Sequence, residues 1–429
     1  MGRVKFCGFS PSSEKLPITI CQLLITTMRL RFQLLVFMLL RTILNTMHRM
    51  VYPFLAVFAR GLGVDLTTFS FAITARSLVG ALSPALASFA DQRGRKFGML
   101  AGALSFTLGM GVVAFAPNIY TLSAAMLLAI LGKYLFDPAM QAYFGDRVPY
   151  ERRGTALAIT EVAWSLSFIA GIPLMGWLIN RYGWTAPFPL LAGLGVGMFI
   201  ALWRMIPHED PHHVRTSDSR ANFRAVLTNT TALAGISIAL WASASNELVN
   251  LIFGVWLEDS FGLQITALAG ASAVIGLSEL SGEGLVALTT DRLGKTRALV
   301  IGLVGNALAA LALPFIGTTP VGALVGLFFY YITFEYIMVS HIPLMSELVP
   351  EARATLLSFN LTGHSLGRAI GALLSTFIYT RFGFFPIVVV SGLFNVFALI
   401  ALGELTQRVV ILPRVLAWTR RFTGMPARD

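Results

Sequence analysis

Long apolar stretches, each ended by glycine, proline or charged residues, dominate this chain. A helix that spans a bilayer needs ~20 consecutive apolar residues, and only helices and closed barrels satisfy every backbone polar group inside lipid. The composition agrees, because 56% of the residues are hydrophobic and only 12% are charged. We predict an all-α integral membrane protein with twelve transmembrane helices, at 32–58, 66–90, 97–116, 119–144, 155–180, 184–205, 229–258, 265–289, 298–316, 319–345, 355–380 and 384–405.

The second half of the chain repeats polar and glycine positions of the first half at a distance of 200 residues. Asp91 and Asp291 follow this spacing, as do Gly94 and Gly294, and each pair lies where an apolar stretch ends in basic residues. Such a long shared period indicates two copies of one six-helix unit. The same spacing relates Glu151 to Glu351, Arg153 to Arg353, Thr155 to Thr355, Gly171 to Gly371, Arg181 to Arg381 and Gly183 to Gly383.

One polar segment, 206–228, separates the two units. Its three histidines could bind a metal, but we interpret the segment as a solvated cytoplasmic linker without a metal site. The N-terminal six-helix bundle is then 32–205, the C-terminal bundle is 229–405, and a basic cytoplasmic tail follows at 406–429. We expect residues 1–31 to form a cytoplasmic extension, because their apolar run is too short to span a bilayer. A start at Met28 stays open.

The distribution of Lys and Arg predicts the orientation in the membrane. If both termini are cytoplasmic, the loops and tails on that side carry 24 of the 32 basic residues, and the opposite side carries only Arg60, Arg181 and Arg381. By the positive-inside rule we expect a multi-pass protein of the plasma (inner) membrane with both termini in the cytoplasm. The net charge of +11 is explained by these loops and does not predict nucleic-acid binding.

Ionisable residues inside the apolar stretches are the strongest indication of function. A charge at bilayer depth costs several kcal/mol when it faces lipid, so it faces protein or a water-filled cavity. The stretches 97–116, 184–205, 298–316 and 384–405 have no such residue in their interiors and are predicted to face lipid. The fourteen interior residues are Arg41, His48, Arg49, Arg76, Lys133, Asp137, Glu161, Glu247, Glu279, Glu283, Glu335, His341, His364 and Arg368.

These charges are mostly basic in the first half and mostly acidic in the second. We predict that they pair across the interface as a latch, formed in one state and broken in another. Glu279 and Glu283 lie four apart on one helix face, where two like charges cannot both ionise cheaply. Glu335 is isolated among apolar residues, whereas Lys133 and Asp137 are also spaced for an ordinary intrahelical ion pair. The candidate carriers of a coupling proton are Asp137, Glu247, Glu279 and Glu335.

The first apolar stretch contains a polar face. Arg41, Asn45 and Arg49 are spaced four apart and share one side of a helix. Pro53 is expected to break or kink the helix beyond them. The face could be a buried network that fixes helix packing or the lining of a site for a polar or charged ligand. We favour a solute site, formed by Arg41, Asn45, His48, Arg49, Tyr52, Asn246, His364 and Arg368.

Motifs for catalysis or nucleotide binding are missing from the sequence. It has no P-loop, no His-Glu-x-x-His zinc helix and no Gly-x-Ser-x-Gly elbow. Its two cysteines allow neither a disulfide framework nor a cysteine-based metal site. The sequence therefore predicts a protein that is not an enzyme and that uses no cofactor.

A family signature follows the second apolar stretch, in Ala87-Ser-Phe-Ala-Asp91-Gln-Arg93-Gly94-Arg95-Lys96. It resembles the Gly-x-x-x-Asp-x-x-Gly-Arg-Lys/Arg signature of the major facilitator superfamily, with alanine in place of the first glycine. A weaker copy stands at 287–297, and the loops at 146–154 and 347–353 are similar to the family's linkers. The resemblance covers 32–405. It implies two six-helix bundles related by pseudo-two-fold symmetry, which alternate access to a site at the bilayer midplane.

The resemblance also implies a gate on the cytoplasmic side. Asp91 would cap the start of the eleventh helix, where the helix dipole favours an anion, and Arg95 would reach Asp146. The second copy would act in the same way with the fifth helix. These contacts would hold the cytoplasmic side shut in the outward-facing state. The implied gating residues are Asp91, Arg95, Asp146, Asp291, Lys295 and Glu347.

The fifth stretch contains Gly171-Ile-Pro173-Leu-Met-Gly176, which is similar to the Gly-Pro-x-x-Gly motif of drug–proton antiporters. One extra residue separates its glycine and proline, and the usual arginine early in the fourth helix is replaced by Lys133 as the nearest basic residue. We expect a proton-coupled secondary active transporter of a small organic solute, with export favoured over import, that works as a monomer in membrane lipid. The alternative is a non-transporting receptor or scaffold on the same fold.

Overall fold

The apolar stretches fold into helices. A computed structural model describes residues 16–86, 93–148, 159–207 and 219–407, and these residues contain helices and turns but no strand. The first half consists of α1 (Leu16–Met50), α2 (Leu55–Leu62), α3 (Leu66–Gly80), α5 (Arg95–Phe115), α6 (Ile119–Arg147), a helix that starts at Ile159 and continues through the π-helical turn η1 (Ser167–Gly171) into α8 (Ile172–Tyr182), and α9 (Pro187–Met205).

The second half repeats this plan. It consists of α10 (Ser219–Thr228), α11 (Thr230–Phe261), α12 (Ile265–Leu293), α13 (Lys295–Ile316), α14 (Pro320–Leu348), the short turn η3 (Pro350–Ala352), α15 (Arg353–Phe382) and α16 (Phe384–Thr406). Each of the twelve predicted stretches overlaps a helix within the described residues. The first helix starts earlier than predicted, at Leu16, because no glycine or proline interrupts the chain between Pro17 and Pro53.

Nine of the described helices are long and apolar enough to cross a membrane, and α1 with α2 forms a tenth candidate as a bent pair. The two parts of this pair meet at 67°, and the break contains Pro53, as predicted. The two remaining stretches contain α3 and α15. The fold is therefore that of a multi-pass helical membrane protein.

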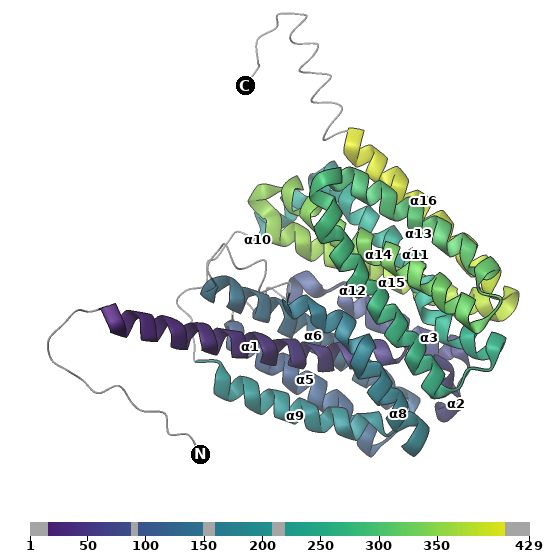
Figure 1. Ribbon diagram of the computed structural model, residues 1–429, viewed down its shortest axis with the longest axis horizontal. Helices are drawn as coiled ribbons and strands as arrows, with labels where there is room; N and C mark the ends of the chain where they lie inside the picture. Colours follow the sequence, from purple (N-terminus) through teal and green to yellow (C-terminus); the bar gives the residue numbers. More distant parts are fainter. Residues whose placement is uncertain (1–15, 87–92, 149–158, 208–218, 408–429) are drawn as a thin grey trace, which may run out of the picture.

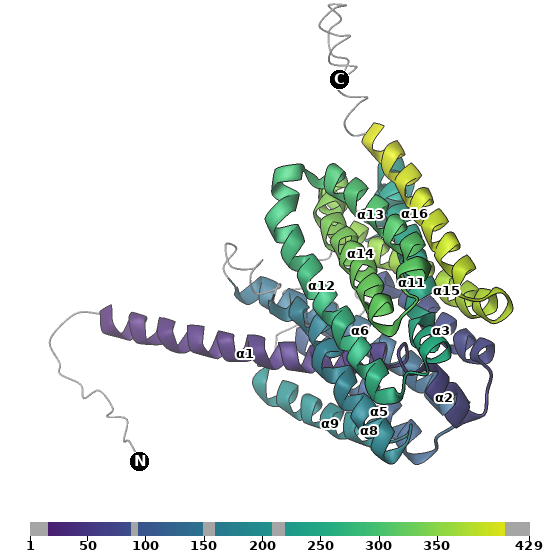
Figure 2. The ribbon, with the colours of Figure 1, turned by 45° about the vertical axis from the view of Figure 1, so that its right-hand side comes forward.

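The helices form two bundles with matching internal contacts (Figures 1 and 2). In the first bundle α5 packs on α6 and α9, and in the second α13 packs on α14 and α16. Between the bundles α3 packs on α15, and α8 packs on α12. A shift of 200 residues relates α3 to α12 and α8 to α15, so these two interface contacts are pseudo-two-fold equivalents of each other. The predicted pseudo-symmetry is confirmed.

The two halves pack tightly at the end of the molecule that carries α2. A Cβ atom added to Gly254 of α11 would lie 2.5 Å from the carbonyl oxygen of Pro53, so only glycine permits this approach. Nearby, Nη1 of Arg60 on α2 lies 2.8 Å from Oε1 of Glu258 on α11. The ribbons of the two halves diverge toward the opposite end, where α1 begins and α16 ends (Figures 1 and 2).

Within the first bundle, α5 and α6 approach each other through a pair of glycines. A Cβ atom on either Gly102 or Gly132 would lie 2.6 Å from the carbonyl oxygen of the other. Small residues at such crossings let two backbones come into contact, and dispersion forces between the backbones then stabilise the pair in lipid.

We expect Gly102→Ala to lower the free energy of unfolding by about 1–3 kcal/mol, because the new methyl group overlaps a backbone oxygen that cannot rotate away. The matched control is Gly111→Ala on the same helix, where a Cβ atom would meet no atom within 4 Å. The control should be neutral or stabilising by up to about 1 kcal/mol. Thermal unfolding of both variants in one detergent measures the difference, and equal melting temperatures would contradict the packing argument.

Candidate functional site

A pocket lies between the two halves and contains most of the predicted solute-binding residues. His48, Arg49 and Tyr52 reach it from the end of α1 and the turn that follows. Asn246 reaches it from α11, and Arg368 from α15. Both halves therefore contribute to one site. The complete lining is His48, Arg49, Tyr52, Trp164, Ser243, Asn246, Glu247, Asn250, Glu279, Tyr331, Phe334 and Arg368.

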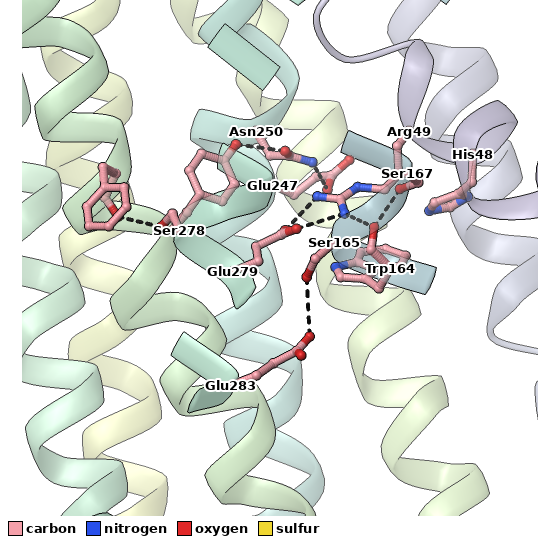
Figure 3. Close-up of polar contacts among 12 residues, drawn as sticks. His48, Arg49, Trp164, Ser165, Ser167, Glu247, Asn250, Ser278, Glu279 and Glu283 are labelled. Atoms are coloured by element: carbon pink, nitrogen blue, oxygen red, sulfur yellow. Dashed lines mark hydrogen bonds and ion pairs between the residues drawn. The ribbon is translucent and has the colours of Figure 1, made fainter. Parts of the chain in front are cut away.

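A bidentate ion pair joins the halves at this pocket (Figure 3). Nη2 of Arg49 lies 2.5 Å from Oε1 of Glu279, and Nη1 donates to Oε2 at 2.8 Å. Both side chains are only 3% exposed. Nη1 also donates to the carbonyl oxygen of Trp164, and the guanidinium carbon lies 3.4 Å from the ring centroid of Phe168. The predicted pairing of opposite charges across the interface is confirmed at this position.

A second set of polar contacts crosses the interface beside the ion pair of Arg49 with Glu279. The Tyr52 hydroxyl donates to Oε1 of Glu247 at 3.0 Å and accepts from Nη2 of Arg76 at 2.8 Å. Arg76 also donates to the carbonyl oxygen of His48 at 2.9 Å. The other oxygen of Glu247 accepts from Nδ2 of Asn250 at 3.4 Å. Both oxygens of this buried carboxylate thus have donors.

Two predicted solute-binding residues, Arg41 and Asn45, do not line the pocket. Arg41 pairs with Asp137 at 3.2 Å and with Glu161 at 2.8 Å, and its Nη1 donates to a carbonyl oxygen of the neighbouring helix. Nζ of Lys133 lies 2.7 Å from both Oδ2 of Asp137 and Oδ1 of Asn45. The intrahelical pair of Lys133 with Asp137 is present as predicted. These residues all belong to the first half and form a cluster of their own.

Two further acidic residues, one on α12 and one on α14, lie near the ion pair of Arg49 with Glu279. Glu283 accepts from the Ser165 hydroxyl at 3.3 Å, one helical turn beyond Glu279 (Figure 3). Glu335 of α14 is 7% exposed, and its Cβ packs against α12 at Gly282. Within the described part of the chain Glu335 has neither a hydrogen bond nor an ion pair. Three carboxyl groups therefore gather between two adjacent helices.

His364 of α15 lies behind the pocket rather than in its lining. Its Nδ1 lies 2.8 Å from the hydroxyl of Ser243, which does line the pocket, and its Nε2 lies 3.3 Å from Nδ2 of Asn360. His341 of α14 is fully buried, with its ring centroid 6.4 Å from that of His364. Of the three predicted solute-binding residues on α11 and α15, Asn246 and Arg368 therefore line the pocket, and His364 lies in the layer behind it.

Two of the predicted contacts between gating residues are present, one inside each half. Nε of Arg95 lies 3.4 Å from Oδ2 of Asp146, and the side chains of Lys295 and Glu347 form an ion pair. Asp291 is exposed at the end of α12. Asp91 lies outside the described residues, so its contact with the eleventh helix stays a prediction.

The aromatic lining of the pocket was not predicted from the sequence. Trp164 contributes a ring from the helix that starts at Ile159, and Tyr331 and Phe334 contribute two from α14. With 11% aromatic residues in the chain, a single ring carries no signal that separates it from ordinary membrane packing. The spacing of Trp164 three residues after Glu161 was the only available hint, because it puts both on nearby faces of one helix.

Comparisons with known proteins agree with this architecture. The sequence matches the pattern of the Major Facilitator Superfamily over residues 37–349 and 242–414. The MFS-type transporter YwfA of Bacillus subtilis is 24% identical, over 83% of this chain and 90% of its own length. The multi-drug resistance efflux pump PmrA of Streptococcus pneumoniae is 24% identical, over 80% of this chain and 88% of its own length.

A solved structure extends the likeness to the fold. A bacterial homologue of the human lysosomal transporter Spinster, in an inward-facing and occupied conformation, matches with a TM-score of 0.69 at 14% identity. The match covers 87% of this chain and 96% of that one. Together with the doubled six-helix unit, the family pattern that runs across both halves settles the relationship. The chain belongs to the Major Facilitator Superfamily of membrane transporters.

Proposed function

We propose that the protein moves a small organic solute across the plasma membrane by alternating access, that proton movement drives this transport, and that the direction is export. The observation that carries the proposal is the ion pair of Arg49 with Glu279, which joins the two halves beside the pocket. An interface that must open and close can be controlled by a contact that breaks when a ligand or a proton takes its place.

The energetics of burial make this ion pair suitable as a latch. Removing one partner of a buried ion pair costs about 3–5 kcal/mol, because the other charge is left without compensation. A proton on Glu279 would remove the charge that holds Arg49, and a bound solute could then replace part of the lost interaction. A shift of this size is enough to change the dominant conformation of a two-state protein.

Glu335 is the best candidate for carrying the proton, and Glu279 is the candidate whose protonation would release Arg49. Glu335 is buried without a partner among the described residues, and Glu283 adds a third carboxyl group to the same helix pair. A proton on any one of these three carboxyl groups would reduce the repulsion among them. Asp137 is a weaker candidate, because Arg41 and Lys133 already pair with it. Glu247 is intermediate, since its hydrogen-bond donors are the neutral groups of Tyr52 and Asn250.

The two charged contacts near the diverging ends would form the gate. Arg95 with Asp146 and Lys295 with Glu347 occupy corresponding positions in the two halves. We propose that they orient the loops that carry the family signature, so that these loops meet when the site faces the other side. We propose that this end of the molecule faces the cytoplasm, with both termini on that side, because Lys and Arg are concentrated in the loops and tails assigned to that side.

The names of the sequence relatives support export. They include multi-drug resistance efflux pumps of Lactococcus lactis and Streptococcus pneumoniae and the multidrug resistance protein MdtG of Serratia proteamaculans. In this proposal the protein works as a monomer in membrane lipid, uses no cofactor and catalyses no chemical reaction. Its partners are the solute and protons.

Solute-driven proton flux tests the proposal. Proteoliposomes with a trapped pH indicator would be exposed to a panel of organic acids, amines and neutral compounds. We expect the wild type to move protons with at least one compound and Glu335→Gln to lose this flux. Glu404→Gln, at an exposed position of α16, is the matched control and should keep it. If the wild type moved no compound but bound a partner protein tightly, the result would favour the alternative, a non-transporting receptor or scaffold.

A comparison of two ion pairs tests the latch. Both Arg49 with Glu279 and Arg60 with Glu258 join the two halves, but the Arg60 side chain is 60% exposed. We expect Arg49→Ala to lower the free energy of unfolding by about 3–5 kcal/mol, and Arg60→Ala by about 0–1 kcal/mol. Thermal unfolding measures both. Restored stability when Arg49→Met is combined with Glu279→Leu would support the pairing, and a transporting Arg49→Glu variant would refute the latch.

A further inference from the structure

We infer that the solute is an organic monoanion with an aromatic or apolar body, and that Arg368 binds its negative charge. This inference rests on the proposed transport function and names the class of solute that the same pocket would take. It depends on three observations: a cation without a carboxylate partner, carboxylates whose oxygens are already occupied, and a neutral part of the lining that fits an apolar ring.

Arg368 and Arg76 differ from the other basic residues of the membrane interior, because neither has a carboxylate within ion-pair distance among the described residues. Arg76 donates instead to the carbonyl oxygen of His48 and to the hydroxyl of Tyr52. Arg41, Arg49 and Lys133 each lie within ion-pair distance of a carboxylate. The guanidinium of Arg368 lies instead 3.4 Å from Nε2 of His48 and 5.8 Å from the ring centroid of Trp164. Among the described residues no carboxylate lies within ion-pair distance of it. A desolvated charge without a counter-ion is costly, so this pocket gains free energy when an anion enters.

The acidic residues of the pocket do not offer the reverse arrangement, a site for a cation. Both oxygens of Glu279 accept from Arg49, and those of Glu247 accept from Tyr52 and Asn250. At Glu279 a cationic solute would have to compete with the guanidinium of Arg49, and at Glu247 it would have to share a carboxylate that already accepts two hydrogen bonds. An anionic solute at Arg368 adds an interaction and breaks none.

The sum of the charges at the site predicts the charge of the solute. Among the groups that line the pocket or hydrogen-bond to its lining residues are three guanidinium groups, those of Arg49, Arg76 and Arg368, and two carboxylates, Glu247 and Glu279. One negative charge on the solute would balance the set. A guanidinium can only donate, so Nε2 of His48 accepts from Nη1 of Arg368 at 3.4 Å, and an imidazole whose Nε2 accepts adds no further positive charge.

The remaining lining describes the rest of the solute. Asn246 is 5% exposed, and its side chain makes no hydrogen bond within the described part of the chain, so its amide can donate to a second acceptor. Trp164, Tyr331 and Phe334 supply aromatic surface around it. A few polar groups that fix orientation within a mainly apolar wall are typical of sites for small organic molecules. An aromatic carboxylate meets all of these requirements.

Binding to purified protein tests the inference without any transport. The probes are benzoate and 2-naphthoate, compared with benzamide and benzylamine, which keep the ring and change the charge. Thermal shift and calorimetry in detergent measure binding, because a ligand that binds the folded protein raises its melting temperature. We expect the acids to stabilise the wild type and to bind more tightly than the amide or the amine. Tighter binding of the amine, or no binding of either acid, would overturn the inference.

Variants then test whether Arg368 is the residue that binds the negative charge of the solute. We expect Arg368→Gln to weaken binding of the acids by about 30-fold or more, since truncating one partner of a buried charged contact has effects of this size. Arg381→Gln, at an exposed position of the same helix, is the matched control and should bind like the wild type. If Arg368→Gln does not fold, Arg368→Lys decides the question, because it keeps the charge and should retain preference for the acids over the amine.

The outcomes separate this inference from the transport proposal. Proton-coupled flux of an amine, with no binding of the acids, would refute the anion site and leave the transporter intact. Acid binding that depends on Arg368, with no flux for any compound, would support the anion site and refute transport.

Discussion

The buried ion pair of Arg49 with Glu279 is the interaction on which the arrangement of the two halves depends. Each half has its own internal helix contacts, so each can keep its structure while the interface changes. A charge left unpaired in a medium without water costs several kcal/mol. The position of α1 relative to α12 is therefore restricted to arrangements that satisfy this arginine, whether by the glutamate, by water or by a bound anion.

The other charged clusters have a different consequence, because they lie within one half. Arg41, Lys133 and Asp137 connect α1 to α6 inside the first bundle. Their pairing fixes the face of α1 that carries Arg49 and so aims that side chain at the partner bundle. A rigid cluster beside a breakable contact is the combination that a rocking motion of two bundles requires.

The architecture could be predicted from the sequence because lipid allows so few solutions. Apolar length located the helices, Pro53 located the bend, and the 200-residue period located the two-fold relationship. The site was predicted less completely. Helical spacing correctly placed Arg41 and Arg49 on one face, but it does not reveal which helix covers each end of that face. Asp137 covers Arg41 and the pocket opens at Arg49, a distinction that exists only after the bundles pack.

The internal repeat and the charges follow different rules, so a fold with two-fold symmetry encloses a pocket without it. Glycines and loop residues recur after 200 positions, whereas Arg49 corresponds to Val249 and Glu279 to Val79. A symmetric frame allows the two halves to rock toward either side with equivalent contacts. A symmetric pocket would present the same charges twice, and like charges would face each other across the axis. The asymmetry instead places a cation of one half opposite an anion of the other. It extends to Arg368, Glu247 and Glu335, whose counterparts are Phe168, Met47 and Leu135.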